Sequence, residues 1–205
     1  MAYTASAVTF MLPNIDIPVV FTGSQLPLAD VLSDGPDNLR TAFAMAASGH
    51  SGVFLAFDRK VMLGCRAVKV RASGFSAFES VNARYAAQVT GLGLTVDREV
   101  LPTTHGEAML KPALSANVFL LKLTPGLNPA VFDMLAAMGY KGIVIEAFGL
   151  GGINVSTKDS GVSTGLWRTA SAWWSPPNAS TTAPTCGSTR WATNCWTWAS
   201  SRAGT

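Results

Sequence analysis

The stretch from Pro18 to Asn38 constrains the fold of this chain more than any other. It begins with the apolar run Val19–Phe21, whose β-branched residues favour a buried strand. The small polar residues Thr22–Gln25 then end the strand, and Ser33–Pro36 has the chemistry of a helix start. A strand, a polar loop and a helix in this order place reactive groups at the carboxyl end of a parallel sheet. On spacing alone the stretch favours an ordinary strand-to-helix connection, and a polar loop that binds a small ligand stays open as the alternative.

Predicted strands alternate with predicted helices along the rest of the chain. Short apolar runs such as Val53–Phe57 favour buried strands, whereas residues 39–47 are amphipathic with the period of a helix. This alternation predicts the α/β class, with a mainly parallel sheet and helices on both faces. Strands are predicted at 18–21, 53–57, 61–63, 65–70, 92–101, 118–123 and 142–147, helices at 2–12, 39–47 and 129–138, and a loop at 74–78.

Charge and cysteine content exclude several classes of function. Residues 1–155 hold equal numbers of acidic and basic side chains, so the net charge of +3 lies wholly in residues 156–205. A neutral main body does not suggest a basic patch for nucleic acid or for an anionic membrane. No apolar run is long enough for a transmembrane helix. The three cysteines form no disulfide framework and fit a reducing cytoplasm, and Cys65 is expected to be a buried apolar residue.

Three sequence blocks in a fixed order point to a family. They read MAYTASAVTFML at the start of the chain, PVVFTGSQLPL from Pro18 and SDGPDNL from Ser33. Together they resemble the asparaginase family, and its cytoplasmic type I branch in particular. In that family the first block directly follows a Gly-Thr-Asp-Thr motif, whereas here it begins at Met1. We therefore expect an N-terminally truncated member, with the resemblance continuing in frame to about residue 155.

The resemblance implies the two-domain architecture of the asparaginases, here incomplete. We expect residues 1–104 to be the remainder of the N-terminal catalytic domain, and residues 105–115 to be a linker. Residues 116–155 are expected to be the start of a smaller C-terminal α/β domain. The resemblance also implies that the intact family member is a cytoplasmic homodimer or homotetramer.

The implied reaction converts L-asparagine and water to L-aspartate and ammonia through a threonine nucleophile, without a metal or another cofactor. The family's Thr-Gly-Gly-Thr and Gly-Thr-Asp-Thr motifs are both missing here, so this polypeptide alone is expected to be inactive. Missing segments should also expose sheet edges and apolar surface, which favours aggregation or proteolysis. Two alternatives stay open, a non-catalytic, pseudogene-like fragment and the asparaginase-like subunit of a tRNA-dependent amidotransferase.

Candidate site residues follow from the same resemblance. Lys69, in the block CRAVKVRASGFSAFES, matches the catalytic lysine of the family, and a desolvated lysine can accept a threonine proton. Ser24 falls where the family's loop contacts the substrate, with Gln25 beside it. Asn154 resembles an asparagine that reaches a neighbouring subunit's site. The alternatives are a solvent-facing strand lysine and turn chemistry alone for the loop, and Asp34 is expected to cap a helix.

Residues 156–205 differ in kind from the rest of the chain. All six tryptophans lie between Trp167 and Trp198, and no helix or strand period is visible, so we expect disorder. Shifting a back-translation of Trp173–Cys186 by one base allows VVVATQCLYDGADL, and its continuation allows RLYEVGHQLLDLGVIPGGD. Both words resemble the C-terminal domain of type I asparaginases, which predicts that the tail is a frameshift product. A true Trp-rich binding tail is the alternative.

Overall fold

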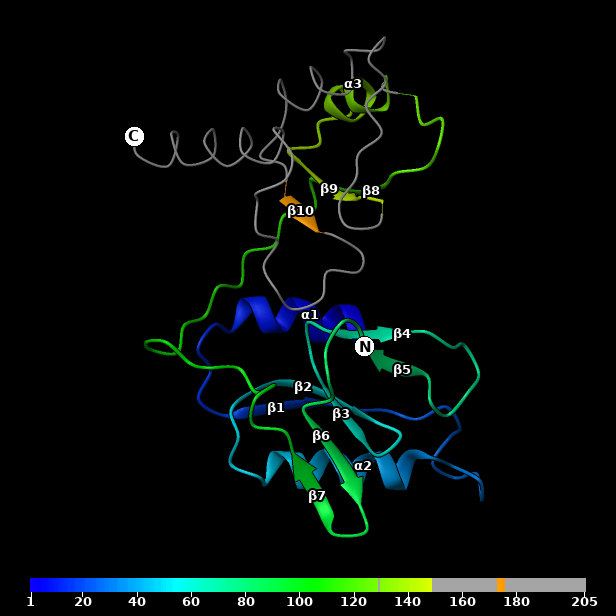
Figure 1. Cartoon of the computed structure of the whole chain (residues 1–205), viewed down its shortest axis with the longest axis vertical. Helices are drawn as coiled ribbons and strands as arrows, with labels where there is room; N and C mark the ends of the chain where they lie inside the picture. Colours follow the sequence, from blue (N-terminus) through cyan, green and yellow to red (C-terminus); the bar gives the residue numbers. More distant parts are fainter. Residues whose placement is uncertain (129, 149–172, 176–205) are drawn as a thin grey trace. The chain divides into compact units, whose positions relative to one another are not determined.

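The chain separates into two compact units, Met1–Leu114 and Ser115–Thr205. We analysed a computed structural model, which describes residues 1–128, 130–148 and 173–175 (Figure 1). The division lies inside the range 105–115 in which the sequence predicts a linker. That the two units are the domains of the asparaginase architecture stays a prediction, and each unit is described by itself below.

The first unit is organised around a five-stranded sheet with the order β1-β2-β3-β6-β7. Its strands are β1 (Pro18–Phe21), β2 (Gly52–Phe57), β3 (Lys60–Leu63), β6 (Ala87–Thr90) and β7 (Gly93–Val96). Strands β1 and β2 pair in parallel, whereas β2 with β3, β3 with β6 and β6 with β7 pair antiparallel. The α/β class is confirmed, but this sheet is mixed rather than mainly parallel, because short turns join β2 to β3 and β6 to β7.

Two helices cover opposite faces of this sheet, as expected for the class (Figure 1). Helix α1 (Ala2–Met11) lies over β2 and β4, and helix α2 (Gly35–Ala46) packs on β1, β2 and β3. Helix α1 approaches Gly64 so closely that a Cβ there would lie 2.7 Å from Thr9 Oγ1 and 2.9 Å from the Ala5 carbonyl oxygen. Only glycine permits this contact without a shift of the helix backbone.

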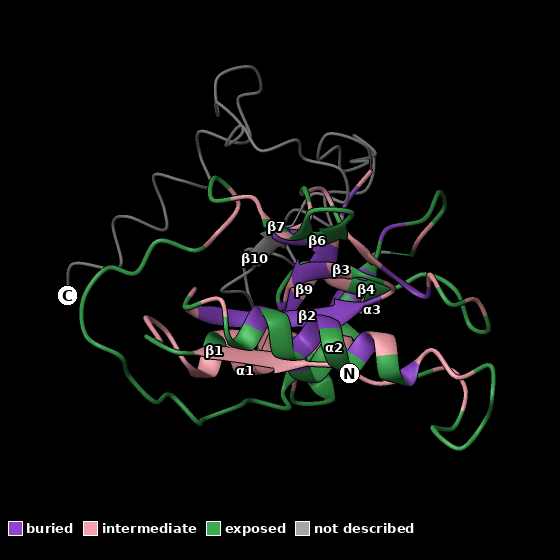
Figure 2. Ribbon diagram, turned by 90° about the horizontal axis from the view of Figure 1, so that it is seen from below, coloured by how far each residue is buried: buried purple, intermediate pink, exposed green. Residues whose placement is uncertain are grey.

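Strand β2 is buried on both faces and joins two hydrophobic clusters (Figure 2). Phe54 points to the side of α2, where it packs in a cluster with Met45. Leu55 and Phe57 point to the opposite side and share a second cluster with Phe78. Successive strand residues face opposite sides of a sheet, so a run without polar residues is required here. The sequence predicted this strand correctly for that reason.

The turn between β2 and β3 has an unusual backbone. Asp58 and Arg59 have φ values of 50° and 60°, in the left-handed region that side-chain-bearing residues rarely adopt. Two such residues in succession match the hairpin turn whose twist suits its flanking strands. The Asp58 amide donates a hydrogen bond of 2.8 Å to Asn38 Oδ1, which holds the turn against α2.

A two-stranded hairpin carries Lys69. It consists of β4 (Ala67–Lys69) and β5 (Phe78–Ser80), which pair antiparallel with Lys69 opposite Phe78. The sequence predicted an extended segment at 65–70 but treated 74–78 as loop, and β5 begins at its last residue. It also missed β6, and β7 is shorter than the strand predicted at 92–101, because the amide of Val100 already donates to Asp97 in a turn.

The second unit is a parallel arrangement of strands and a helix. It contains β8 (Val118–Lys122), α3 (Ala130–Ala137), β9 (Gly142–Glu146) and β10 (Trp173–Ser175), with the sheet order β10-β9-β8. Phe132 and Leu135 of α3 pack against Ile143 and Ile145 of β9. The first three elements agree with the prediction. Strand β10 lies within the range 156–205, for which we expected no regular structure, and the rest of that range lies outside the described residues.

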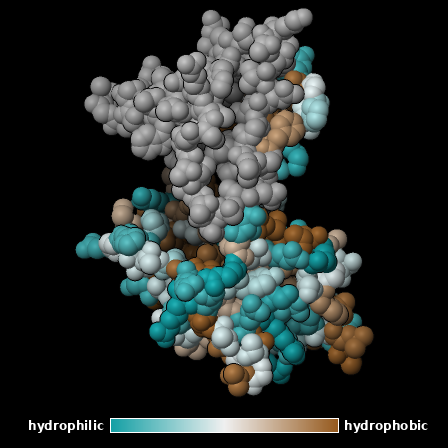
Figure 3. Space-filling view, in the orientation of Figure 1, coloured by the Kyte–Doolittle hydropathy of each residue, from teal (hydrophilic) through white to brown (hydrophobic). Residues whose placement is uncertain are grey.

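The face of the first unit that Figure 3 shows carries polar side chains interspersed with apolar ones. Exposed apolar side chains include Tyr3 and Phe10 on α1 and three residues of the following loops, Leu28, Val31 and Leu32. Among the helices of the described ranges, none combines the length and the hydropathy that crossing a bilayer requires.

Asp37, at the start of α2, forms ion pairs of 3.0 Å with both Arg40 and Arg59. These arginines lower the pKa of Asp37 below its ordinary value of 3.8, and the hydrogen bond from Arg59 is the larger cause. The pKa of Asp37 is lower in the folded state than in the unfolded state. The ion pairs therefore stabilise the fold above about pH 4, and this stabilisation is lost as the pH falls through the folded-state pKa.

We expect Asp37→Asn to lower the free energy of unfolding at pH 7 by about 0.5 kcal/mol or less, since exposed pairs are screened by water. The difference from the wild type should be smaller at about pH 2 than at pH 7, because the wild-type carboxyl is protonated as the pH falls through its lowered pKa. Urea denaturation followed by circular dichroism at both pH values measures it. A difference that grows towards acid pH would contradict the assignment.

Candidate functional site

The loop between β1 and α2, residues 22–34, is closed on itself by one carboxylate. Asp34 accepts hydrogen bonds from the backbone amide of Gln25 at 2.9 and 3.1 Å and from that of Leu26 at 3.1 Å. Asp34 stands at the position before α2, but its side chain accepts no hydrogen bond from the backbone amides of the first helical turn. The prediction that Asp34 caps the helix is therefore wrong, because the carboxylate binds across the loop instead.

Asn38 connects this loop to the rest of the sheet. Its side-chain amide donates to the Gly23 carbonyl at 2.9 Å and to Asp34 Oδ2 at 2.8 Å. Its oxygen accepts from the amide of Asp58, so three backbone segments meet at one side chain. Asn38 is only 1% exposed. Buried amides of this kind have to be fully hydrogen-bonded, and this one fixes the loop, α2 and the β2–β3 turn together.

Lys69 lies beside the loop at the end of β4. Its Nζ is 3.4 Å from Gln25 Oε1 and 5.8 Å from the centroid of the Phe78 ring. Lys69 is exposed, Gln25 is half-buried and Ser24 is exposed. The structure thus brings Lys69 and Gln25 together, although 44 positions separate them in the sequence. Asn154 lies outside the described residues.

The segment between β4 and β5, residues 70–77, borders the same site. Gln25 Nε2 donates to the carbonyl oxygens of Ala72 at 3.0 Å and Gly74 at 2.9 Å. Ser76 Oγ donates to the Asp58 carboxylate, which ties the other side of the 70–77 loop to the β2–β3 turn. The site therefore consists of two loops that face each other, one with Ser24 and Gln25 and one that follows Lys69.

Sequence reasoning missed two residues of this network, Asn38 and Asp58. A weak signal for Asn38 was present, since Asp34 and Asn38 are four positions apart at a helix start, where side chains can meet. The role of Asp58 could not have been found, because its partner Ser76 lies in a different hairpin. No group of three or more His, Cys, Asp or Glu side chains that could hold a metal ion occurs in the described part of the chain.

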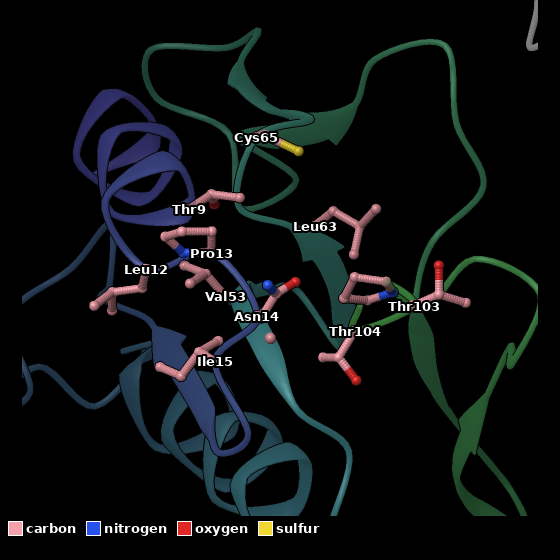
Figure 4. A pocket seen from close by; sticks show the side chains of 12 residues that line it. Thr9, Leu12, Pro13, Asn14, Ile15, Val53, Leu63, Cys65, Thr103 and Thr104 are labelled. Carbon is pink, nitrogen blue, oxygen red and sulfur yellow. The ribbon is translucent and has the colours of Figure 1, made fainter. Parts of the chain in front are cut away.

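A separate shallow pocket of about 120 Å³ lies between α1, β3 and the segment 102–104 (Figure 4). Its lining is mainly apolar, and Leu63, Val53 and Thr103 are among the residues that form it. Cys65 lines it and is exposed, so the expectation of a buried cysteine is wrong. The reason is that Cys65 follows the last residue pair of the hairpin β2–β3 and lies outside the core.

Comparisons with known proteins agree with the three sequence blocks. The family model "Asparaginase, N-terminal" matches residues 1–101. The L-asparaginase of Thermococcus kodakarensis is 45% identical over 153 residues, which are 75% of this chain and 46% of that protein. L-asparaginase 1 of Escherichia coli K12 is 36% identical over 155 residues, covering 74% and 45% respectively.

The solved structure of the thermostable L-asparaginase from Thermococcus kodakarensis has the same fold, with a TM-score of 0.76 and 39% identity. The alignment covers 87% of this chain and 55% of that one. The chain thus spans about half the length of the relatives that it matches. The match across α1, the main sheet and the Lys69 hairpin shows that this chain belongs to the asparaginase family, of which residues 1–101 are N-terminal domain sequence.

Proposed function

We propose that this chain carries part of an amidohydrolase site that acts on L-asparagine and releases L-aspartate and ammonia. The observation that carries the proposal is the position of the Lys69 amine, next to Gln25 and the polar 22–34 loop. In such a site a threonine hydroxyl attacks the carbon of the side-chain amide, and ammonia leaves. Water then cleaves the resulting ester and frees aspartate. Lys69 is the group that takes the proton from the threonine and delivers it to the departing nitrogen.

Ser24 has the role of binding the amino acid ends of the substrate. It is exposed at the site, and it lies close to Gly35, where a Cβ would be 3.3 Å from Ser24 Cβ. A small polar residue on a loop that Asp34 holds closed can present its hydroxyl and backbone without rearrangement. Asparagine is favoured over glutamine as the test substrate because the similar proteins are named asparaginases.

In the family the nucleophilic threonines belong to the Thr-Gly-Gly-Thr and Gly-Thr-Asp-Thr motifs, and residues 1–148 contain neither motif. The Met1 side chain lies against the 22–34 loop, with its Cε 3.2 Å from a Cβ placed on Gly23. We infer that the chain of 205 residues does not hydrolyse L-asparagine by itself. A complete site in a homo-oligomer does.

Two assays test this function. The purified chain should release no ammonia from L-asparagine above the rate of a heat-treated sample. In a chimera, the 153 aligned residues of this chain replace their counterparts in the Thermococcus kodakarensis L-asparaginase. This chimera should hydrolyse L-asparagine. In the chimera Lys69→Met should reduce kcat by about 10²–10⁴, the range of general acid–base catalysis. Ser24→Ala should mainly raise KM.

The control for Lys69 is Lys111→Met, a lysine on an exposed segment beyond β7. Its chimera should retain kcat within a factor of about two, as expected for surface substitutions. If Lys69→Met and Lys111→Met behave alike in a folded, active chimera, Lys69 has no catalytic role. If the unsubstituted chimera folds but does not hydrolyse L-asparagine, the chain is a non-catalytic relative.

A further inference from the structure

We propose that Gln25 is a positioning residue that couples the 22–34 loop to the hairpin carrying Lys69. A primary amide has two N–H donors and one oxygen acceptor. In Gln25 the donors bind the carbonyl oxygens of Ala72 and Gly74, and the oxygen accepts from Lys69 Nζ. The side chain is therefore occupied by the protein itself, which differs from the substrate contact that the sequence suggested for it.

The backbone of Gln25 is fixed as firmly as its side chain. Its amide donates to both oxygens of the Asp34 carboxylate, and Asp34 is held in turn by the buried Asn38. A charge-assisted hydrogen bond of this kind is stronger than a neutral one. The backbone of Gln25 is therefore held in place, and its side chain links the 22–34 loop to the β4–β5 hairpin.

Two side chains join the 70–77 loop to segments outside its own hairpin, Ser76 and Gln25. The hairpin is closed by the amides of Val70 and Arg71, which donate to the Ala77 carbonyl at 2.9 and 3.3 Å. Beyond this closure, Ser76 binds Asp58 on one side and Gln25 binds Ala72 and Gly74 on the other. Without Gln25 the loop would keep the contact of Ser76 with Asp58 and, inside the hairpin, the bonds of the Arg71 side chain to the Ser76 carbonyl and to Glu79. The Lys69 amine would keep its contact with the Phe78 ring.

This role rests on the proposed function, in which the Lys69 amine has to meet a threonine hydroxyl. A lysine side chain has four rotatable bonds and is exposed here, so its amine samples many positions unless a partner holds it. Restricting it in advance reduces the entropy lost in the reaction. Gln25 also orders the loop that follows Lys69, and it therefore acts on Lys69 through both the side chain and the backbone.

The first measurement is hydrogen exchange of the Val70 and Arg71 amides in the full chain. Gln25→Met keeps the length of the side chain and removes all three hydrogen bonds. Exchange of these amides should become roughly tenfold faster, because two such hydrogen bonds together change an opening equilibrium by about that factor. Gln88→Met, at an exposed glutamine of β6, is the matched control and should change the rates less than about twofold.

The second measurement follows Lys69 by NMR of lysine-labelled protein. The Lys69 Nζ lies 5.8 Å from the centroid of the Phe78 ring, so we expect the adjacent ε-methylene to carry a ring-current shift. In Gln25→Met this shift should move towards the value of an unstructured lysine. Gln25→Glu should keep the lysine signal in place, since a carboxylate still accepts from Nζ, but it should accelerate exchange as much as Gln25→Met, since it faces two carbonyl oxygens without a donor.

Equal exchange in Gln25→Met and Gln88→Met, or an unmoved Lys69 signal in Gln25→Met, would overturn the proposal. If the variant does not fold, the wild-type chain still provides a test, because both side-chain amide protons of Gln25 should exchange more slowly than those of Gln88. Equal rates there would also overturn it. None of these measurements needs substrate, so a failure of the asparaginase chimera leaves the structural role of Gln25 intact, and the reverse also holds.

Discussion

Phe54→Ala is expected to lower the free energy of unfolding of the first unit by about 3–5 kcal/mol, the cost of a large cavity in a packed core. Phe54 is fully buried in the centre of β2 and packs with Met45, Val61 and Ala87. Strand β2 cannot move to fill the cavity, because it is hydrogen-bonded to β1 along one edge and to β3 along the other. A loss of this size is a large fraction of the stability of a domain.

The measurement is hydrogen exchange of the β2 amides, which report the opening of this unit alone. Tryptophan fluorescence would not serve, because all six tryptophans follow residue 166. Phe43→Ala is the matched control, since Phe43 lies on α2 and is 69% exposed. It should change the free energy by about 0.5 kcal/mol or less. Similar losses in both variants would mean that the α2 side of β2 is not a packed core.

Asn38→Ala is expected to lower the free energy of unfolding by about 2–4 kcal/mol, because it leaves buried polar groups without partners. The Asp34 carboxylate and the Gly23 carbonyl would lose a donor, and the Asp58 amide would lose its acceptor. The loss should also release the loop, so that the Gln25 and Leu26 amides exchange faster. Both effects are measured in one hydrogen-exchange experiment on the full chain.

Asn38→Asp is the informative second variant. It keeps an acceptor for Asp58 but brings a carboxylate against Asp34, and like charges at this distance repel. It should therefore destabilise the fold at least as much as Asn38→Ala at pH 7, with partial recovery at acid pH as one carboxyl is protonated. Gln88→Ala, at an exposed position of β6, controls for loss of side-chain length. If Asn38→Asp left the free energy of unfolding unchanged, Asn38 would not be the residue that connects these segments.

The elements that could be predicted from the sequence are those that bury apolar runs. Strands β1, β2, β8 and β9 and helix α3 follow from local composition, since each needs only its own residues to be recognised. Helix α2 begins at Gly35 rather than at 39, because Pro36 is already suited to the first turn. Strands β5 and β6 were missed because both are short and depend on pairing with distant segments.

The site shows the same division between local and distant information. Family blocks led to the prediction of Lys69, Ser24 and Gln25 as site residues, but only the fold reveals that Gln25 binds the lysine and the loop behind it. Asp34 was predicted to be a helix cap because a cap is a local interaction, whereas the backbone amides that it binds lie eight and nine positions earlier in the chain. Which of these partners a carboxylate binds depends on the tertiary structure, and a pattern along the sequence does not contain that information.

The left-handed turn at Asp58 and Arg59 bears on which substitutions this family member can accept. Side-chain-bearing residues lose roughly 1–2 kcal/mol each in that conformation, and glycine would recover part of it. At Arg59 the exchange would sacrifice only an exposed ion pair with Asp37. At Asp58 it would remove the carboxylate that binds Ser76. Selection for thermal robustness and selection for an ordered site thus agree at one position of this turn and oppose each other at its neighbour.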